Sequence, residues 1–351
     1  MGYEQLERGL LWVVILLPVG KFEIFEMSSM TSSVISPRVI IHGGAGGSLR
    51  SKGGIEAVRS ILQGIVTQVY EHVENGGHAA DAVVLGCRRL EDEPRFNAGT
   101  GSVLQSDGQI RMSSALMDGA KLRFSGVINT SGLKNPIEIA QFLQGERDRV
   151  LSDVGARELL RELQVPVFNP LTDLRLNEWM EERKGGFEKS MASTLAESFS
   201  EESQEDNAGR GTIGVVVLDQ LGNIAAGTST GGKGFERVGR VSDSAMPAGN
   251  YANGVAGVSC TGIGEDIIDE CLAAKIVIRT TDGLSLGESF EKSIAEATVN
   301  GRDLGAIGLD RSGAIAWGKT SEVLVAAYHD GETIGDTLEL GEGMQVGGFT
   351  G

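Results

Sequence analysis

The sequence has few of the residues that build metal centres and disulfide frameworks. Its 351 residues include three cysteines without CxxC spacing and four histidines without an HxxxH or other ligand-spaced pair. No group of carboxylates resembles a calcium loop. These absences argue against zinc, calcium and a set of disulfides. We therefore expect chemistry that needs no metal or other cofactor for catalysis, in a reducing cytoplasm.

Basic residues are also scarce. The chain has 31 Lys and Arg against 48 Asp and Glu, which gives a formal net charge of -17. Binding to phosphates is driven largely by Lys and Arg, because these side chains release counterions. We therefore expect neither a nucleic acid nor a membrane as a partner, whereas a small polar substrate is compatible with this charge.

The most hydrophobic run of the chain is short. The run LLWVVILL, at residues 10–17, is too short to cross a bilayer. Glutamates stand on both sides of it, where a secretory signal would have a basic segment and a small-residue cleavage site. We interpret residues 1–36 as an N-terminal extension that is disordered or dispensable, and a signal or anchor is the alternative.

From Arg38 onward the pattern is typical of a folded domain with strands and helices. RVIIH indicates a strand and GGAGG a turn, and apolar residues at helical spacing predict helices over 54–73 and 79–90. The segments SVLQS and IRMSSALMDG, which are separated by DG, predict a hairpin, and PIEIAQFL predicts a helix. From about 181 to 211 the chain is rich in Ser, Glu, Gly and Asn, which predicts a solvated linker.

A strongly apolar strand pair follows this linker. TIGVVVLD begins at Thr212 and NIAAGTST follows after a turn, in which Gly222 is free to take a positive φ. If the two strands pair about Leu221, Thr212 lies opposite Thr230, within one residue for a bulge.

The C-terminal part continues the mixture of strands and helices. We expect a strand at GVAGVSC, a turn at TGIGED, a helix at IIDECLAAKIVIRT and a hairpin at GAIGLDRSGAIAWG. Two packed sheets covered by helices fit this order better than strict alternation of strand and helix. The predicted fold class is therefore α+β.

Thr212 is the strongest candidate for a nucleophile. A threonine hydroxyl needs an adjacent base, and its own α-amine serves once the preceding peptide bond is cut. That amine titrates near neutral pH, so part of it is uncharged there. Gly211 precedes it, and glycine can adopt the strained backbone that self-cleavage exploits. Taken alone, a strand that begins with Thr after a loop is the more ordinary interpretation.

The wider sequence resembles the plant-type asparaginase and isoaspartyl peptidase family. The resemblance covers about 38–145 and 209–325, with the blocks VIIHGGAGG, FNAGTG, GTIG, TSTGG, GRVSDS and TGIGE in order. It implies the four-layer αββα fold of N-terminal nucleophile hydrolases. It also implies self-cleavage into an α chain, 37–211, and a β chain, 212–351, which together form one composite domain. The resulting αβ heterodimer would pair with a second one.

The resemblance also assigns roles to particular positions. It makes Thr212 the nucleophile, released by cleavage after Gly211, with Thr230 as its hydroxyl neighbour and Asn97 as its support. Thr261 and Gly262 would form the oxyanion hole. The substrate's α-carboxylate and α-ammonium groups would be held by Arg240 and Asp243, and its amine would also contact Gly264. A surface salt bridge is the ordinary alternative for the Arg240 and Asp243 pair.

The loop from Leu90 to Thr100 matches one that binds a structural sodium ion in several members of the family. The ion would be held by backbone carbonyls of Leu90, Glu91, Glu93, Phe96, Ala98 and Thr100.

The glycine turn TGIGED has a rival interpretation as a phosphate-cradling loop, but Glu265 and Asp266 would repel a phosphate. The glycine clusters HGGAGG and GGKG do not fit GxxxxGK[ST] and are weak evidence for a nucleotide site, and His42 itself is expected to be structural.

The function implied by the resemblance is hydrolysis of L-asparagine and β-aspartyl dipeptides to L-aspartate by acyl transfer through Thr212. A glycosylasparaginase is the alternative, because that branch shares the IAAGTST and GRVSDS context. A threonine aspartase acting on intact proteins, a nucleotide-binding module and a catalytically silent relative remain further options. The sequence has SDSA at 242–245, where the family often has GDSP, and this change leaves the choice of leaving group open.

Overall fold

The structure is a computed structural model, which describes residues 13–16, 22–25, 35–46, 53–187 and 211–349. The chain divides into two compact units, Met1–Val34 and Ile35–Gly351. In the first unit, β1 (Val13–Leu16) pairs antiparallel with β2 (Phe22–Phe25). The sequence pattern did not predict these strands, and the dispensability of 1–36 stays a prediction. Within the described part of the chain, no helix has the length and apolar character to span a membrane.

The second unit contains a sheet of eight strands. Its strand order is β14-β13-β3-β7-β8-β4-β5-β6, and every neighbouring pair is antiparallel except β5 and β6. The strands are β3 (Arg38–Gly46), β4 (Met112–Asp118), β5 (Arg123–Thr130), β6 (Val150–Ser152), β7 (Ile213–Leu218), β8 (Ile224–Thr230), β13 (Val323–His329) and β14 (Ile334–Asp336). Segments from both sides of the predicted cleavage point therefore share one sheet.

A second sheet of five antiparallel strands has the order β15-β12-β11-β10-β9. Its strands are β9 (Asn250–Ala252), β10 (Ala256–Gly262), β11 (Leu304–Asp310), β12 (Ile315–Lys319) and β15 (Gln345–Phe349). The helices are α1 (Ile55–Glu74), α2 (Ala79–Glu91), α3 (Pro136–Leu143), α4 (Asp153–Glu162), α5 (Asp173–Lys184), α7 (Gly264–Glu270), α8 (Leu272–Thr281) and α9 (Leu286–Val299), with a short 3-10 turn at η2 (Asp243–Ala245).

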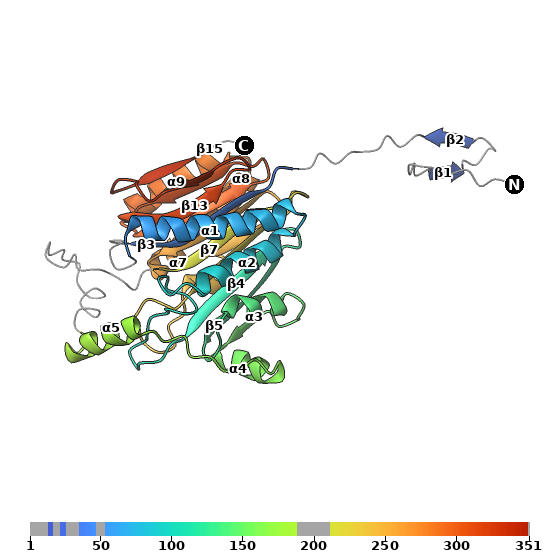
Figure 1. The fold of residues 1–351 in the computed structure, drawn as a ribbon. Helices are drawn as coiled ribbons and strands as arrows, with labels where there is room; N and C mark the ends of the chain where they lie inside the picture. The colour runs from blue at the N-terminus through green and yellow to red at the C-terminus, as the bar shows by residue number, and fades with distance from the viewer. Residues whose placement is uncertain (1–12, 17–21, 26–34, 47–52, 188–210, 350–351) are drawn as a thin grey trace. The chain divides into compact units, whose positions relative to one another are not determined.

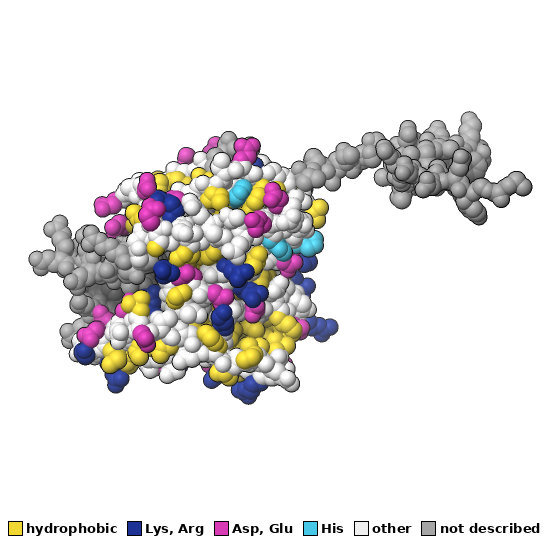
Figure 2. Space-filling view, viewed as in Figure 1, with side chains coloured by type: hydrophobic (Ala, Val, Ile, Leu, Met, Phe, Trp, Pro, Cys, Tyr) yellow, Lys and Arg dark blue, Asp and Glu magenta, His cyan; other side chains and the backbone are white. Residues whose placement is uncertain are grey.

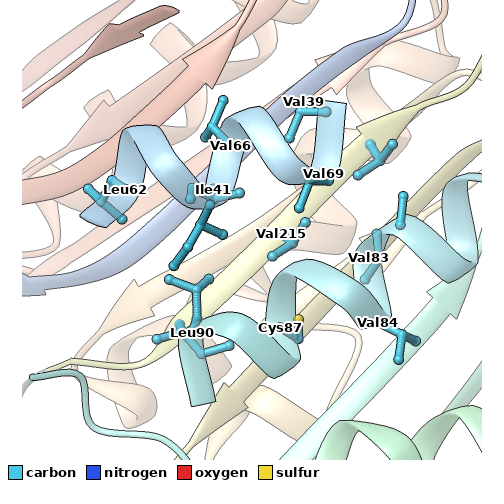
Figure 3. Close-up of a cluster of buried hydrophobic side chains, with 14 of the residues drawn as sticks. Val39, Ile41, Leu62, Val66, Val69, Val83, Val84, Cys87, Leu90 and Val215 are labelled. Atoms are coloured by element: carbon cyan, nitrogen blue, oxygen red, sulfur yellow. The ribbon is translucent and has the colours of Figure 1, made fainter. Parts of the chain in front are cut away.

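Four hydrophobic cores among the described residues hold these elements together; the smallest packs α3 and α4 against β4 and β5, and the three largest position the two sheets. In the first, Val66, Val69 and Val83 of α1 and α2 pack against Ile41 and Val215 on one face of the eight-stranded sheet (Figure 3). A second core joins the five-stranded sheet to α7, α8 and α9. The third includes residues of both sheets, such as Ile40 and Val216 with Ile307 and Leu309. Because both faces of β7 are covered, its sequence is apolar at nearly every position.

The surface agrees with a chain that has many charges of both signs. On the face shown in Figure 2, the Lys and Arg side chains of the described residues are interspersed with Asp and Glu. The same view, compared with Figure 1, has hydrophobic side chains near α3 and α4, where Phe142 and Val154 are exposed. Such scattered apolar residues are ordinary on a protein surface.

Most of the predicted elements are confirmed. The helices predicted over 54–73, 79–90 and at PIEIAQFL correspond to α1, α2 and α3, and the two C-terminal hairpin strands are β11 and β12. The first predicted hairpin is wrong, because residues 102–106 are not a strand. Their backbone N–H groups make hydrogen bonds to loop residues instead of to a neighbouring strand. Val103 N donates to Asn97 Oδ1, and Gln105 N donates to the carbonyl of Gln109.

The single helix predicted at IIDECLAAKIVIRT is also wrong. It is divided into α7 and α8 at Cys271, whose φ is 46°. The N–H groups of Ala273 and Ala274 donate to the carbonyls of Ala248 and Pro247 rather than to a preceding helical turn. This tertiary bonding replaces the helical ladder and allows the break. The linker begins later than the predicted position of about 181, because α5 extends to Lys184. Residues 188–210 of the predicted linker lie outside the described residues.

Lys319 provides a test of how the C-terminal segment is held. Its side chain is fully buried, and Nζ donates to the carbonyls of Ser321, Glu322, Gly341 and Gly343 at 2.7–3.2 Å. We expect Lys319→Met to lower the free energy of unfolding by about 2 to 4 kcal/mol, because these carbonyls lose a charged donor. Urea unfolding measures the change.

The matched control is Lys184→Met, because the Lys184 side chain is 67% exposed and pairs with Glu181, whose side chain is 72% exposed. This control should cost under about 1 kcal/mol. Equal losses in the two variants would contradict the importance of the buried ammonium.

Candidate active site

The hairpin of β7 and β8 brings Thr212 and Thr230 together. Ile213 pairs with Ser229 and Gly214 with Thr228, which is the register predicted from pairing about Leu221. Asp219 holds the turn, since its carboxylate accepts from the N–H groups of Leu221 and Asn223. At the open end of the hairpin, Thr212 Oγ1 donates to Thr230 Oγ1 at 3.0 Å. Both threonines are buried.

Asn97 holds the backbone on both sides of this pair. Its N–H donates to the carbonyl of Gly211 at 3.1 Å, and its carbonyl accepts from Gly231 N at 2.8 Å. Its side-chain amide donates to the carbonyl of Gly232 at 2.7 Å. Gly232 N in turn donates to Thr230 Oγ1 at 3.1 Å. The structure therefore gathers Gly211, Thr212, Thr230 and Asn97, as the resemblance implies.

Thr261 and Gly262 lie at the end of β10, which packs against β3, β7 and β8. The Thr261 hydroxyl accepts from Ala45 N at 3.0 Å. His42 on β3 pairs with Gly214 on β7, so extending this register by two residues places Gly44 opposite Thr212. Ala45, which donates to Thr261, therefore directly follows Gly44, which faces Thr212.

Gly262 needs to be glycine for two reasons. Its φ is +129°, a conformation that other residues rarely adopt. In addition, a Cβ there would lie 2.6 Å from the carbonyl oxygen of Asp303. The same carbonyl accepts from Ile263 N at 2.9 Å, which fixes the turn between β10 and α7.

Arg240, Asp243 and Gly264 converge in one place. A Cβ added at Gly264 would lie 2.6 Å from Nη2 of Arg240 and 2.8 Å from Oδ1 of Asp243. Any side chain at position 264 would therefore occupy the space between these two charged groups. Arg240 is further positioned by Asn129, whose amide donates to its carbonyl at 2.8 Å.

Glu265 is a member of this group that sequence reasoning did not assign to it. Arg240 donates to both of its carboxylate oxygens, from Nε at 2.7 Å and from Nη2 at 2.9 Å. These hydrogen bonds lower the pKa of Glu265 to about 2. Its position next to Gly264, in the first turn of a helix, was the available signal. An incoming carboxylate has to share or replace Glu265 as the partner of Arg240.

Asp243 is fully enclosed and electrostatically unusual. Burial raises its pKa to about 7, against the opposing attraction of Arg240. Its Oδ2 has no hydrogen-bond partner among the described residues. A buried carboxylate without such a partner is unfavourable unless a cation neutralises it. The group is therefore suited to receive an ammonium group.

The loop after α2 is compact but does not test the predicted sodium site. Glu91 carbonyl accepts from Thr100 N at 2.8 Å, and Glu93 carbonyl accepts from Phe96 N at 3.1 Å. Gly99 has a φ of +54°, and a Cβ there would collide with Glu91. The carbonyl set from Leu90 to Thr100 stays a prediction.

Comparison with known proteins adds to this geometry. A family model described as asparaginase matches residues 35–339. The chain belongs to the asparaginase family. This membership confirms the resemblance stated from the sequence motifs.

Individual members of the asparaginase family are also similar over most of their length. An isoaspartyl peptidase/L-asparaginase of Nostoc sp. is 66% identical over 318 residues, which are 91% of this chain and 99% of the relative. One of Synechocystis sp. is 62% identical over 89% of this chain and 94% of the relative. A plant-type L-asparaginase of Pyrococcus horikoshii is 36% identical over 83% and 95%.

The space at Gly264 can be tested by filling it. We expect Gly264→Ala to raise the KM for L-asparagine by at least about tenfold, because its methyl group enters the space between Arg240 and Asp243. Steady-state kinetics measures the change. Gly287→Ala in α9 is the control, since nothing lies within 4 Å of its Cβ, and its KM should be unchanged. An unchanged KM in Gly264→Ala as well would mean that the substrate head binds elsewhere.

Proposed function

We propose that this chain is a self-processing amidohydrolase that converts L-asparagine and β-aspartyl dipeptides to L-aspartate. The observation that carries the proposal is the Thr212 hydroxyl, 3.0 Å from Thr230 and directly after Gly211, in a chain of the asparaginase family. The relatives of Nostoc sp. and Synechocystis sp., both named isoaspartyl peptidase/L-asparaginase, support this substrate class.

Maturation begins in the intact chain. Thr212 Oγ1 attacks the carbonyl carbon of Gly211, and the proton of the hydroxyl moves to the leaving nitrogen of Thr212. The C–N bond breaks and an ester forms, which water hydrolyses to leave a carboxylate on Gly211 and a free amine on Thr212. The N–H of Asn97, already bound to the Gly211 carbonyl, stabilises the charge that develops on that oxygen.

Substrate hydrolysis uses the same hydroxyl. The free amine of Thr212 takes the hydroxyl proton, and Oγ1 attacks the side-chain amide carbon of the substrate. Thr261 Oγ1 and Gly262 N–H donate to the oxyanion of the tetrahedral intermediate. Ammonia or an amino acid leaves with a proton, and water then cleaves the acyl ester to release aspartate.

The head of the substrate is held by opposite charges. Arg240 offers a planar guanidinium for the α-carboxylate, and Asp243 receives the α-ammonium together with the space at Gly264. Asparagine and β-aspartyl peptides both carry the α-carboxylate and the α-ammonium, so this part of the site does not distinguish between these substrates.

We extend the proposal to the assembly. The cores on either side of the two sheets support a four-layer αββα arrangement. The cleaved α and β chains would remain together as a heterodimer, because β3 and β7 pair across the cut. A dimer of such heterodimers, a cytoplasmic location and a structural sodium ion at the 90–100 loop complete the proposal. Catalysis itself would use no cofactor.

Comparison of leaving groups tests the function. On fully cleaved protein we expect β-aspartyl-leucine and L-asparagine both to be hydrolysed, with the dipeptide at least as good by kcat/KM, because its leucine can add binding contacts. Glycosylasparagine should be poor. If glycosylasparagine is better by tenfold or more, which is about 1.4 kcal/mol of transition-state preference, the glycosylasparaginase alternative replaces our proposal.

The raised pKa of Asp243 predicts a pH dependence of substrate binding. Above a pKa of about 7 the group is a carboxylate and attracts the α-ammonium, whereas below it the group is neutral and this attraction is lost. The KM for asparagine should therefore rise as pH falls below about 7, approaching about tenfold per pH unit. Measured from pH 5.5 to 8, a flat KM in the native protein would contradict the role of Asp243. Asp243→Asn should have a higher KM that does not change in this range.

A further inference from the structure

Three buried polar side chains link the two sheets next to the active site. Ser259 Oγ lies 3.0 Å from His42 Nε2 and 2.6 Å from Thr228 Oγ1. His42 belongs to β3 and Thr228 to β8 of the eight-stranded sheet, whereas Ser259 belongs to β10 of the five-stranded sheet. All three are 0% exposed. We call this group, His42, Ser259 and Thr228, the inter-sheet tie.

The tie follows the active-site residues at a constant spacing. Thr228 is two residues before Thr230 on β8, and Ser259 is two residues before Thr261 on β10. Side chains two residues apart on a strand lie on the same face. The tie is therefore one step along the same inner surface from the hydroxyls of the active site.

Strand β7, which follows Thr212, leaves room for the inter-sheet tie at Gly214. Gly214, two residues after Thr212, pairs with His42 on one side and with Thr228 on the other. A Cβ at Gly214 would collide with Ser259 Oγ and His42 Nε2. The strand that begins beside the nucleophile thus has a glycine at the position where the tie passes.

The hydrogen bonds of the tie can run in either direction. Thr228 can donate to Ser259 and Ser259 to His42. Alternatively, His42 can donate to Ser259 and Ser259 to Thr228, with Thr228 donating to the carbonyl of Gly249 at 3.4 Å. The middle hydroxyl takes part in both arrangements. Removing either hydroxyl therefore interrupts the connection between the sheets.

We propose that His42, Ser259 and Thr228 are positioning residues, which fix the distance between Thr212 on one sheet and the oxyanion donor Thr261 on the other. Ala45 N of β3 also donates to Thr261 Oγ1 of β10 at 3.0 Å, whereas contacts farther along these strands are aliphatic, for example Val216 with Ile307, and are not directional. Hydrogen bonds weaken steeply when distance or angle changes. The tie is thus a directional restraint beside the reacting groups. This inference rests on the proposed function.

The inference predicts which kinetic constant changes. A misplacement of about 1 Å between reacting groups can lower a rate by on the order of a hundredfold. Arg240 and Asp243, which hold the substrate head, are not members of the tie. Loss of the tie should therefore lower kcat while KM changes little, the pattern expected when an interaction acts only in the transition state.

The decisive comparison is between two substitutions of Thr228. Thr228→Val keeps the shape and removes the hydroxyl, whereas Thr228→Ser keeps the hydroxyl. We expect Thr228→Val to lower kcat for β-aspartyl-leucine by at least about tenfold, with KM within about threefold. Thr228→Ser should recover most of kcat. Ser259→Ala should behave like Thr228→Val, and both should slow self-cleavage of the precursor.

Thr280→Val is the matched control. Thr280 is a buried threonine of α8 that likewise bonds a carbonyl, that of Ile276, and a serine hydroxyl, that of Ser289, each at 3.0 Å. All variants are compared well below their own unfolding midpoints, so that stability does not enter. A kcat in Thr228→Val within twofold of the native value, an equal loss in Thr280→Val, or no recovery in Thr228→Ser would overturn the inference.

Self-cleavage separates failure of the inference from failure of the proposed function. If the native protein cleaves itself but hydrolyses none of the substrates, the proposed function fails. The tie is then judged by the half-time of cleavage, which should lengthen at least about tenfold in Thr228→Val and recover in Thr228→Ser. A native chain that neither cleaves nor hydrolyses would overturn both.

Discussion

The register between β7 and β8 is the constraint on which the rest of the site depends. It places the first residue after Gly211 opposite the last residue of β8, so two hydroxyls meet at 3.0 Å in the buried end of a sheet. A slip of one residue would turn Thr212 to the other face of the sheet and would separate it from Thr230. The apolar side chains of β7, packed on both faces, make such a slip unfavourable.

The site combines this rigid pair with a buried carboxylate that is unfavourable by itself and a guanidinium that already has a partner. Asp243 is buried with a raised pKa, and Arg240 is engaged by Glu265. In the function that we propose, the ammonium of a zwitterionic amino-acid head neutralises Asp243, and its carboxylate shares or replaces Glu265 at Arg240. The large apolar cores contribute folding free energy that offsets the cost of burying the Asp243 carboxylate.

Much of this arrangement could be predicted from local sequence. Turn chemistry around Gly222, between two strongly apolar strands, was sufficient to pair Thr212 with Thr230, and helical periodicity was sufficient for α1 and α2. The order of the motifs was sufficient for the family. These features depend on residues that are near each other in the chain, which is where sequence patterns are informative.

The remaining features depend on contacts between distant segments. The break at Cys271 follows from hydrogen bonds to residues 247 and 248, and the loop at 102–106 is bound by Asn97. Glu265 reaches Arg240 across 25 positions, and Ser259 reaches His42 across 217. No periodicity or turn signal indicates such partners, so they became evident only in the folded chain.

The central claim is that one hydroxyl, that of Thr212, performs both self-cleavage and hydrolysis. Its most direct test is a time course in which intact mass and asparagine hydrolysis are measured on the same samples of native protein and of Thr212→Ala. The account predicts that activity grows in proportion to a fragment beginning at Thr212, and that Thr212→Ala remains a single inactive chain. Hydrolysis by uncleaved protein, or cleavage at another bond, would contradict it.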